Sequence, residues 1–354
     1  MQPFISHLKQ GVPLVDVGTM RALVNEVGIE AFLVELSRRL EQDFARWQQF
    51  DKSPRYASHS ESGVIELMPI SDGQFFSCKY VNGHPKNTHV GLQTVAAFAV
   101  LADVDTGYPI LLSEMCLLTA LRTAATSALV AKYLAPKNTS TLALIGNGAQ
   151  SEFQALAFKA LLGVSHVRLF DIDIKASHKV KRNLADSGLE VDIFTSAAEA
   201  IEGAQVITTC TADKRNATIL SSDMVKDGVH INAIGGDCPG KTELDAALLK
   251  RAQVFVEYEP QTRIEGDIQQ LDESFAVTEF HQLVNGKAHG RVDEQQLTIF
   301  DGVGFALEDF SALSYVNELI SKQASTRLDL ITQQDDPRDL FSVLQANSAV
   351  QVAV

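Results

Sequence analysis

The sequence lacks the features of a membrane or secreted protein. No apolar run approaches the roughly 20 residues that a membrane-spanning helix needs. The first ten residues have no charged start, apolar core and cleavage site of a signal peptide. The four cysteines, Cys78, Cys116, Cys210 and Cys238, form no Cys-x-x-Cys pair and have no zinc-type spacing. We therefore expect a cytoplasmic chain with free thiols, no metal site and no membrane contact.

Basic residues are also scarce. Lys and Arg number 30 against 44 Asp and Glu, which gives a net charge of −14. No local basic patch offsets this charge, so a phosphate polymer is repelled and nucleic-acid binding is not expected. The 354 residues, 45% of them apolar, are enough for two globular domains of common size.

The first third of the chain has the pattern of an α+β region. Residues 28–50 carry apolar side chains at spacings of three and four, which predicts one buried helical face. Residues 64–68 and 76–81 are predicted strands, and residues 95–103 and 109–112 are predicted to form a hairpin around the turn at 105–108. The residues of the helical face are Phe32, Leu36, Leu40, Phe44 and Trp47.

The second part alternates between strands and helices. A helix is predicted from about residue 117 to Leu134, where Pro136 ends it. Strands are then predicted near 141–145, 166–170, 190–194, 205–210, 229–234, 253–257 and 297–300. This alternation is typical of a parallel sheet covered by helices on both faces. The helix after Gly304 is predicted to return to the first domain.

The most informative motif joins a strand to a helix. Residues 141–145 run into Gly146-Asn-Gly-Ala-Gln-Ser151. This stretch has the pattern Gly-x-Gly-x-x-Ser, in which the small residue Ser151 replaces the third glycine of the dinucleotide-binding pattern. The turn allows a pyrophosphate to approach the backbone, next to a helix N-terminus. Asp171 follows the next strand, where an acidic residue binds the ribose hydroxyls, and with Asp173 it favours NAD over NADP. The alternative is an ordinary tight turn.

Charged residues interrupt several apolar segments. On a strand, Glu66 shares a face with Val64 and Met68, and Lys79 shares a face with Ser77 and Val81. If these faces are buried, each charge needs a partner; the alternatives are solvent exposure or a structural pair. Arg122 lies in a helix start rich in small residues, which would let a ligand approach. Its alternative is a solvated arginine.

A glycine- and proline-rich loop carries a further acidic residue. Gly235-Gly-Asp-Cys-Pro-Gly240 follows a predicted strand, at the carboxyl end where ligands bind in doubly wound sheets. Asp237 is therefore a candidate general acid/base. The alternative is an aspartate that caps the next helix. Lys241 and Arg263, judged alone, fit solvated surface positions.

With these residues established, the chain resembles the ornithine cyclodeaminase/μ-crystallin family, and within it the bacterial cyclodeaminases. The resemblance covers nearly the whole chain except the first dozen residues. The matching stretches are Phe50–Arg55, Ala57–Glu61, Gly63–Pro69, Lys79–Pro85, Ala102–Pro109, Ala120–Thr126, Ala143–Gln154, Gly235–Leu244, Phe255–Gly266, Gly304–Asp309 and Asp336–Ser342.

The resemblance implies an α/β protein, with a Rossmann-type NAD-binding domain (126–312) and an α+β substrate-binding and dimerisation domain (1–125 and 313–354). It implies a homodimer. Catalytic roles would fall on Asp237 and Glu66. Substrate would be bound by Arg55, Lys79, Arg122, Met68 and Val303. NAD would contact Thr94, Arg122, Gly146, Asn147, Gly148, Ala149, Gln150, Asp171, Thr211, Ile231, Asn232, Ala233, Ile234, Lys241 and Gly302. Gly302 stands where the family often has a serine, so one cofactor contact is lost.

The implied reaction converts L-ornithine to L-proline and ammonia, a lyase reaction of proline formation and of ornithine and arginine catabolism. NAD+ takes a hydride from Cα, the δ-amine attacks the resulting imine, ammonia leaves, and the hydride returns. Three alternatives remain: a cyclic-imine reductase or amino-acid dehydrogenase that uses exchangeable NAD(P)H, a lysine cyclodeaminase, and a non-catalytic crystallin-type dinucleotide-binding protein. One methylene separates lysine from ornithine, which a pocket discriminates by only about 1–3 kcal/mol.

Overall fold

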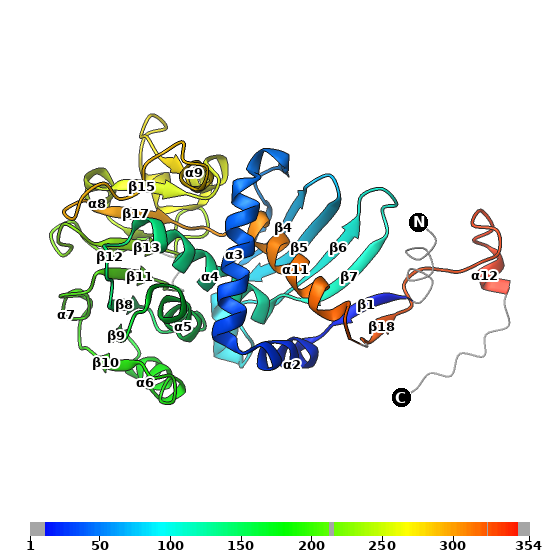
Figure 1. Cartoon of the computed structure of the whole chain (residues 1–354), viewed down its shortest axis with the longest axis horizontal. Helices are drawn as coiled ribbons and strands as arrows, with labels where there is room; N and C mark the ends of the chain where they lie inside the picture. Colours follow the sequence, from blue (N-terminus) through cyan, green and yellow to red (C-terminus); the bar gives the residue numbers. More distant parts are fainter. Residues whose placement is uncertain (1–10, 212–215, 324, 346–354) are drawn as a thin grey trace.

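Two large β-sheets stand side by side, with helices packed between and against them. The computed structural model describes residues 11–211, 216–323 and 325–345. Figure 1 shows a parallel sheet on one side and an antiparallel sheet on the other, with α3 (Ile29–Ala45) between them. Within the described residues, no helix combines the length and apolarity required to cross a membrane.

The other sheet, which we call the antiparallel sheet although β1 and β7 pair in parallel, is built from both ends of the chain. Its strand order is β18-β1-β7-β6-β5-β4-β2, and β3 also pairs with β4. The bounds are β18 (Arg327–Leu328), β1 (Val12–Val15), β7 (Pro109–Glu114), β6 (Ala97–Asp103), β5 (Phe75–Gly83), β4 (Val64–Ser71), β2 (Asp51–Lys52) and β3 (Tyr56–His59). The predicted strands at 64–68 and 76–81 and the hairpin of β6 and β7 are confirmed.

Alternation along β4 fixes which side chains reach the interior. Val64, Glu66, Met68 and Ile70 are buried, whereas Ile65 and Leu67 between them are exposed, as the period of two along a strand requires. Helix α11 (Ala306–Ile320) covers the buried face, and α3 packs against α11. The predicted helical stripe from Phe32 to Trp47 is buried throughout.

The second sheet is entirely parallel, in the order β10-β9-β8-β11-β13-β17-β15-β16. Its strands match the seven predicted positions within one or two residues: β8 (Thr141–Ile145), β9 (His166–Phe170), β10 (Glu190–Ile193), β11 (Val206–Thr209), β13 (His230–Ala233), β15 (Gln253–Val256) and β17 (Thr298–Asp301), with β16 (Thr278–Glu279) added. The order reverses between β8 and β11, which creates the crevice where such sheets bind ligands.

Helices connect the parallel strands, as the alternation predicted. They are α5 (Ser151–Leu162), α6 (Ile174–Asn183), α7 (Ala197–Ile201), α8 (Ala246–Arg251), α9 (Glu259–Glu265) and α10 (Phe280–Val284). The predicted helix from residue 117 is α4 (Cys116–Leu134), and α2 (Val17–Val27) and α12 (Ser342–Gln345) complete the helices described. The fold is therefore α/β, with a Rossmann-type sheet and a second α+β unit.

Sequence patterns missed the short pairings. β12 (Asn216–Leu220) pairs with β14 (Thr242–Leu244) in a small separate sheet, and β1 and β18 were not predicted. These strands are short and fall outside the regular alternation of strands and helices that located the equally short parallel strands. In β14 all three residues are buried, so no alternation marks it.

Helix α11 returns to the first part of the chain, as predicted. It packs against α3, β4 and β5, and Figure 1 shows it lying along the antiparallel sheet. The predicted domain boundaries after residues 125 and 312 fall inside α4 and α11, which are continuous helices. The division into two domains stays a prediction.

An aromatic cluster joins the two parts. Trp47, just after α3, stacks on His281 at a centroid distance of 4.9 Å and lies 5.5 Å from the Phe305 ring. Phe44 meets Phe280 edge to face at 5.0 Å. Because α10 and the chain before α11 carry three of these rings, burial of Trp47 ties the parallel-sheet side to α3.

Replacing this indole should weaken the whole molecule. We expect Trp47→Ala to lower the free energy of unfolding by about 3–5 kcal/mol, because it leaves a cavity among buried rings. Urea denaturation followed by far-UV circular dichroism measures the change, because the variant lacks the one tryptophan that fluorescence would report. Val34→Ala on the exposed side of α3 is the control, expected within about 0.5 kcal/mol of the parent. Equal midpoints for the two variants would contradict the role of Trp47.

Candidate functional site

The glycine turn forms as its sequence predicted. Gly146 directly follows β8 and has φ 92°, and a Cβ there would lie 2.9 Å from the Cys210 carbonyl carbon. Its N–H donates to the carbonyl of Phe170 at 2.9 Å. Glycine is therefore required both by the left-handed backbone and by the close approach of the chain after β11. This turn lies at the reversal point of the parallel sheet.

The start of α5 fits a pyrophosphate. No side chain caps this helix, and Gly148 and Ala149 before it are exposed. A Cβ on Gly148 would meet nothing within 4 Å, so the space beside the backbone is open. Ser151 is buried and donates to the Gly146 carbonyl at 3.1 Å, which confirms that a small residue suffices here. Uncapped N–H groups at a helix start attract phosphate oxygens.

Asp171 lies beside the turn after β9. Its carboxylate accepts from the N–H of Asn147 at 2.5 Å and from that of Asp173 at 2.8 Å. Asn147 is buried, donates to the Leu144 carbonyl and accepts from Ser177. The predicted acidic residue is thus held next to the predicted phosphate site, which is where a ribose would follow a pyrophosphate.

The other predicted cofactor residues line the neighbouring strand ends. Thr211 follows β11, Ile231, Asn232 and Ala233 are buried in β13, and Ile234 follows it. Lys241 is buried rather than solvated, and its Nζ donates to the Thr211 carbonyl at 3.0 Å and to Asp237 at 3.2 Å. Burial alone would lower the pKa of Lys241, but the carboxylates of Asp237 and Glu243 outweigh burial and raise it.

Gly302 has a packing reason. A Cβ at this position would lie 2.7 Å from Cε1 of Phe300, a buried ring at the end of β17. The serine that the family resemblance leads us to expect at this position would require the Phe300 ring to move.

Arg55 and Glu66 meet in the interior. The Arg55 side chain is 6% exposed and lies 3.0 Å from Glu66 and 3.1 Å from Glu265. Its Nη2 also donates to the carbonyl of Val303 at 2.7 Å, which brings three predicted site residues together. Burial would lower the pKa of Arg55, but the Glu66 and Glu265 carboxylates outweigh burial and raise it.

Lys79 and Arg122 share one carboxylate partner, Asp309 on α11. Lys79 is 1% exposed and lies 2.7 Å from Asp309, and Arg122 contacts Asp309 at 3.0 Å and Glu308 at 2.5 Å. The solvated alternatives for Glu66, Lys79 and Arg122 are therefore wrong, as is a direct Glu66–Lys79 pair. Burial lowers the pKa of Lys79 to about 8, although Asp309 opposes the shift.

Asp237 lies in the loop after β13 and is the most exposed charged group of the site. Its side chain is 53% exposed and pairs with Lys241. It does not cap the next helix, because β14 intervenes and Asp245 caps α8 at 2.6 Å from the N–H of Leu248. An exposed carboxylate beside a buried lysine is accessible to a ligand.

Sequence patterns missed the buried acidic residues around this site. Burial, with the nearby carboxylates of Glu66 and Asp237, raises the pKa of Glu265 to about 7 although Arg55 opposes the shift. Burial and the charge of Glu308 raise the pKa of Glu257 to about 8. Glu265, Glu257, Glu308 and Asp309 all lie inside motifs that carry the family resemblance, which was the available signal.

Some predicted residues remain apart from this cluster. Thr94 lies in the loop before β6 and accepts hydrogen bonds through its carbonyl from His84 and Asn82. Arg263, expected at a solvated surface position, is partly buried; it pairs with Glu259 and donates to the carbonyl of Phe275. His166, Glu190 and Asp192 form the single potential metal-ligand group within the described residues, and it lies near the amino-terminal ends of β9 and β10.

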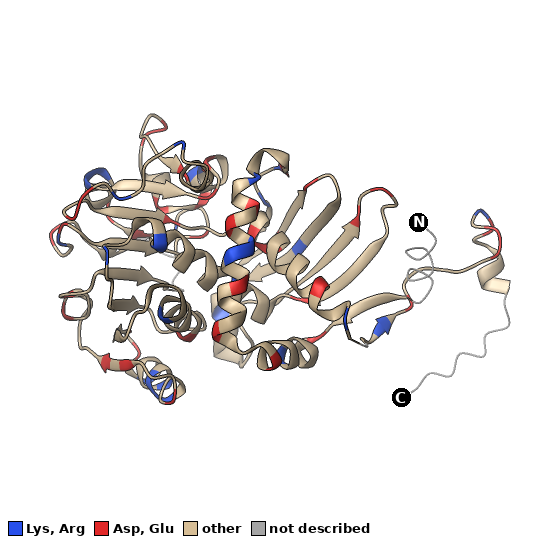
Figure 2. Cartoon of the chain, viewed as in Figure 1, with Lys and Arg blue, Asp and Glu red and all other residues tan. Residues whose placement is uncertain are grey.

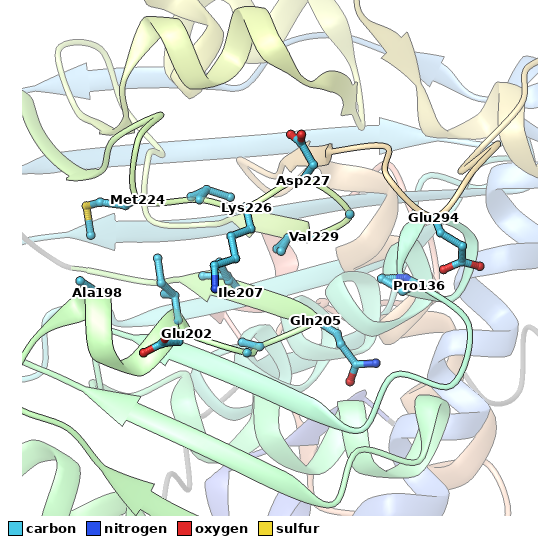
Figure 3. A pocket seen from close by; sticks show the side chains of 15 residues that line it. Pro136, Ala198, Glu202, Gln205, Ile207, Met224, Lys226, Asp227, Val229 and Glu294 are labelled. Atoms are coloured by element: carbon cyan, nitrogen blue, oxygen red, sulfur yellow. The ribbon is translucent and has the colours of Figure 1, made fainter.

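A pocket of about 400 Å³ lies at the opposite edge of the parallel sheet. Figure 3 shows Gln205, Ile207 and Val229 along its floor, with the Lys226 side chain extending across it. These residues lie at the starts of β11 and β13, whereas the glycine turn and Asp237 follow strand ends. The pocket contains none of the predicted site residues.

The fold and the site define a Rossmann-type dinucleotide-binding protein with a charged interior site. The chain belongs to the ornithine cyclodeaminase/mu-crystallin family, whose model matches residues 17–324. It is 60% identical to the ornithine cyclodeaminase of Brucella suis over 334 residues, which cover 94% of this chain and 93% of the relative.

Solved structures show the same fold. A lysine cyclodeaminase that recognises L-lysine, L-ornithine and L-2,4-diaminobutyric acid superposes with a TM-score of 0.88 at 30% identity, covering 94% of this chain and 99% of that chain. An archaeal alanine dehydrogenase dimer with bound NAD superposes with a TM-score of 0.82 at 28% identity, covering 90% and 99%.

Proposed function

We propose that this chain is an ornithine cyclodeaminase that converts L-ornithine to L-proline and ammonia with bound NAD. The observation that carries the proposal is that three buried cations, Arg55, Lys79 and Arg122, each lie against a buried carboxylate. A diamino acid has one carboxylate and two ammonium groups, so it needs both kinds of partner. The 60% identity with a cyclodeaminase supports the same substrate.

The cations would hold the substrate carboxylate. Lys79 and Arg122 come from β5 and α4, and both are buried, where charge-assisted hydrogen bonds are strong. Nη2 of Arg122 makes neither of the two ion pairs of this side chain, which use Nε and Nη1. Asp309 and Glu308 fix these cations in place, and Met68 and Val303 would supply the apolar walls beside them.

Asp237 would move the protons. The δ-amine must lose its proton before it attacks carbon, since its free pKa is about 10.4 by analogy with lysine. An accessible carboxylate can accept that proton and later protonate the leaving ammonia. Lys241 keeps Asp237 oriented. Glu66, which pairs with Arg55, would attract the substrate ammonium group.

The uncapped start of α5 and Asp171 would hold the cofactor. Asp171 and Asp173 disfavour a 2′-phosphate, so NAD is proposed rather than NADP. The bound cofactor supplies hydride removal from Cα and hydride return, with no net redox change. We further propose that Gly146–Gln150, Thr211, Ile231–Ile234, Lys241 and Gly302 contact it and that the chain functions in the cytoplasm.

Relatives with other activities define the alternatives. The alanine dehydrogenase binds NAD on the same fold, and the lysine cyclodeaminase recognises ornithine as well as lysine. Purified protein incubated with L-ornithine and catalytic NAD+ distinguishes them. Equal proline and ammonia without net NADH supports the cyclodeaminase; accumulating NADH, or turnover of a cyclic imine alone, supports a dehydrogenase or a reductase. The same assay with L-lysine measures selectivity.

Removal of the proposed proton carrier should separate binding from turnover. We expect Asp237→Asn to bind NADH normally and to lose at least about 100-fold in kcat, in line with loss of a general acid/base. NADH fluorescence and proline release measure the two properties. Asp186→Asn, on the exposed surface, is the matched control. Near-normal turnover of Asp237→Asn would remove this residue from the mechanism.

The lowered pKa of Lys79 predicts a pH dependence. As the pH rises through about 8, Lys79 loses its charge in the free enzyme and kcat/KM for ornithine should fall. Lys79→Arg stays charged, so the ratio of its kcat/KM to that of the parent should rise about tenfold between pH 7 and 9. The ionisation of the substrate cancels in this ratio. A constant ratio would mean that Lys79 does not bind the carboxylate.

We also propose a homodimer through the outer face of the antiparallel sheet. Exposed apolar residues alternate with the buried ones on β4 and β6, among them Ile65, Leu67 and Phe98, and Phe98 stacks on Tyr80 at 5.1 Å. Figure 2 shows that β4 to β7 carry few charged residues. An apolar face of this kind is typical of an interface between subunits.

A charge on this face should dissociate the dimer. We expect Phe98→Glu, at a residue 56% exposed, to halve the mass measured by sedimentation, because a buried carboxylate without a partner opposes association. Val17→Glu on α2, at a residue 57% exposed, places the same charge away from the sheet and should leave the dimer intact. A dimeric Phe98→Glu would place the interface elsewhere.

A further inference from the structure

Three buried carboxylates lie in series beneath the strand ends of the parallel sheet. Glu243 belongs to β14, Asp267 follows α9, and Asp301 ends β17. All three are at most 1% exposed. Each accepts hydrogen bonds from backbone N–H groups of other segments, so we refer to them together as the carboxylate series.

Glu243 holds the loops next to the candidate site. Its Oε1 accepts from the N–H of Thr211 at 2.7 Å and from the hydroxyl of Thr211 at 2.6 Å, and its Oε2 accepts from the N–H of Gly235 at 3.0 Å. Thr211 follows β11, and Gly235 begins the loop that carries Asp237. One carboxylate therefore fixes two segments that face the crevice.

The next two members hold Glu243 in turn. Asp267 accepts through Oδ1 from the N–H groups of Glu243 and Leu244, both at 2.8 Å. Asp301 accepts from the N–H of Asp267 through Oδ1 and from that of Ile268 through Oδ2, both at 2.9 Å. The position of Asp237 is thus linked through successive hydrogen bonds to β17, which lies between β13 and β15 in the sheet.

Glycines make room for every member of the series. A Cβ on Gly235 would lie 2.1 Å from Oε1 of Glu243, one on Gly236 3.0 Å from Oδ2 of Asp267, and one on Gly266 2.6 Å from Oδ2 of Asp301. Real Cβ contacts are not this short, so at Gly235 and Gly266 the carboxylate and the glycine require each other. A further function of the double glycine before Asp237 is therefore to admit these side chains.

No cation belongs to the series itself, although the charge of Lys241 acts on Glu243 and Asp267. Burial and the charge of Glu243 raise the pKa of Asp267 to about 7. Burial and Asp267 raise the pKa of Asp301 well above its ordinary value. Grouping buried carboxylates is costly, and an apolar core could fill the same space, so stability alone does not account for the series.

We propose that Glu243, Asp267 and Asp301 are positioning residues, which fix the Thr211 segment and the Asp237 loop in the arrangement that cofactor binding and turnover need. This inference rests on the proposed function for its kinetic readout. Its structural readout, the protection of loop amides, is independent of that function.

The central test compares two carboxylates of the same short segment. Glu243→Gln keeps an acceptor for Thr211 but turns an NH2 group toward the N–H of Gly235. Asp245→Asn is the matched control, since Asp245 also accepts backbone N–H groups, from Ser222 at 3.0 Å and Leu248 at 2.6 Å, but holds no segment of the site. Hydrogen exchange of the cofactor-free protein, NADH fluorescence and thermal unfolding are measured for both.

We expect Glu243→Gln to speed amide exchange in peptides spanning 233–241, to weaken NADH binding about tenfold and to lower kcat. Asp245→Asn should lower the melting temperature without these changes. If the two variants lose similar stability and Glu243→Gln keeps loop protection and NADH affinity, the carboxylate series is structural only and the proposal is wrong. If Glu243→Gln loses loop protection but the parent chain itself does not bind NADH, the proposed function is wrong and the positioning role of Glu243 is kept.

A second pair keeps the test valid if Glu243→Gln does not fold. Asp267 binds both of its N–H donors through one oxygen, which Asp267→Asn retains. Asp301 uses both oxygens, so Asp301→Asn must turn an NH2 group toward one of the donors. Both remove one charge. We expect NADH affinity within about twofold of the parent for Asp267→Asn and about tenfold weaker for Asp301→Asn. If both variants weaken NADH binding equally, the lost charge and not the loop position is responsible, and the proposal is wrong.

Discussion

The ion pairs of Asp309 hold the two ends of this chain together. Asp309 on α11 contacts Lys79 from the antiparallel sheet and Arg122 from α4, and all three side chains are buried. Losing one partner would leave a charge in the interior without compensation, at a cost of several kcal/mol. Helix α11 must therefore return to the sheet formed much earlier in the sequence, which explains why both ends of the chain build one structural unit.

The same constraint shapes the electrostatics of the site. Cations are placed where a carboxylate can be bound, and each already has an acidic partner that keeps it in position. The remaining acidic residues are stabilised by backbone N–H groups rather than by cations, as at Asp171 and Glu257. Stabilising a buried carboxylate by backbone N–H groups requires loops whose backbone comes very close to the carboxylate side chain. Close approach accounts for Gly235 and Gly266, which have ordinary backbone angles, whereas Gly146 is also required by its left-handed backbone.

Much of this architecture was accessible from the sequence, for local reasons. The parallel strands and the turn at Gly146 are encoded by contiguous residues, and the positions of Glu66 and Lys79 followed from the period of two along a strand. The pairing of those charges could not be predicted in the same way, because Lys79 and Asp309 are 230 residues apart. Lys241 and Arg122 matched surface patterns when judged alone. Glu308 and Asp309, far along the chain, explain the burial of Arg122, whereas Lys241 is buried beside Asp237, four residues before it. Glu243 and Asp267 lie in short segments without a period, so only the folded backbone identifies what they hold.

Local and distant constraints meet at Gly302. The position follows β17, whose last residue Asp301 anchors the loop at Asp267, and it precedes Val303, whose carbonyl receives Arg55. Phe300 occupies the space that a side chain at 302 would need. A larger residue there would press on this ring, and the ring shares its strand with the anchor of the carboxylate series. Glycine at position 302 therefore avoids a clash beneath the site, at a strand end that leads from the anchor of the carboxylate series to the carbonyl bound by Arg55.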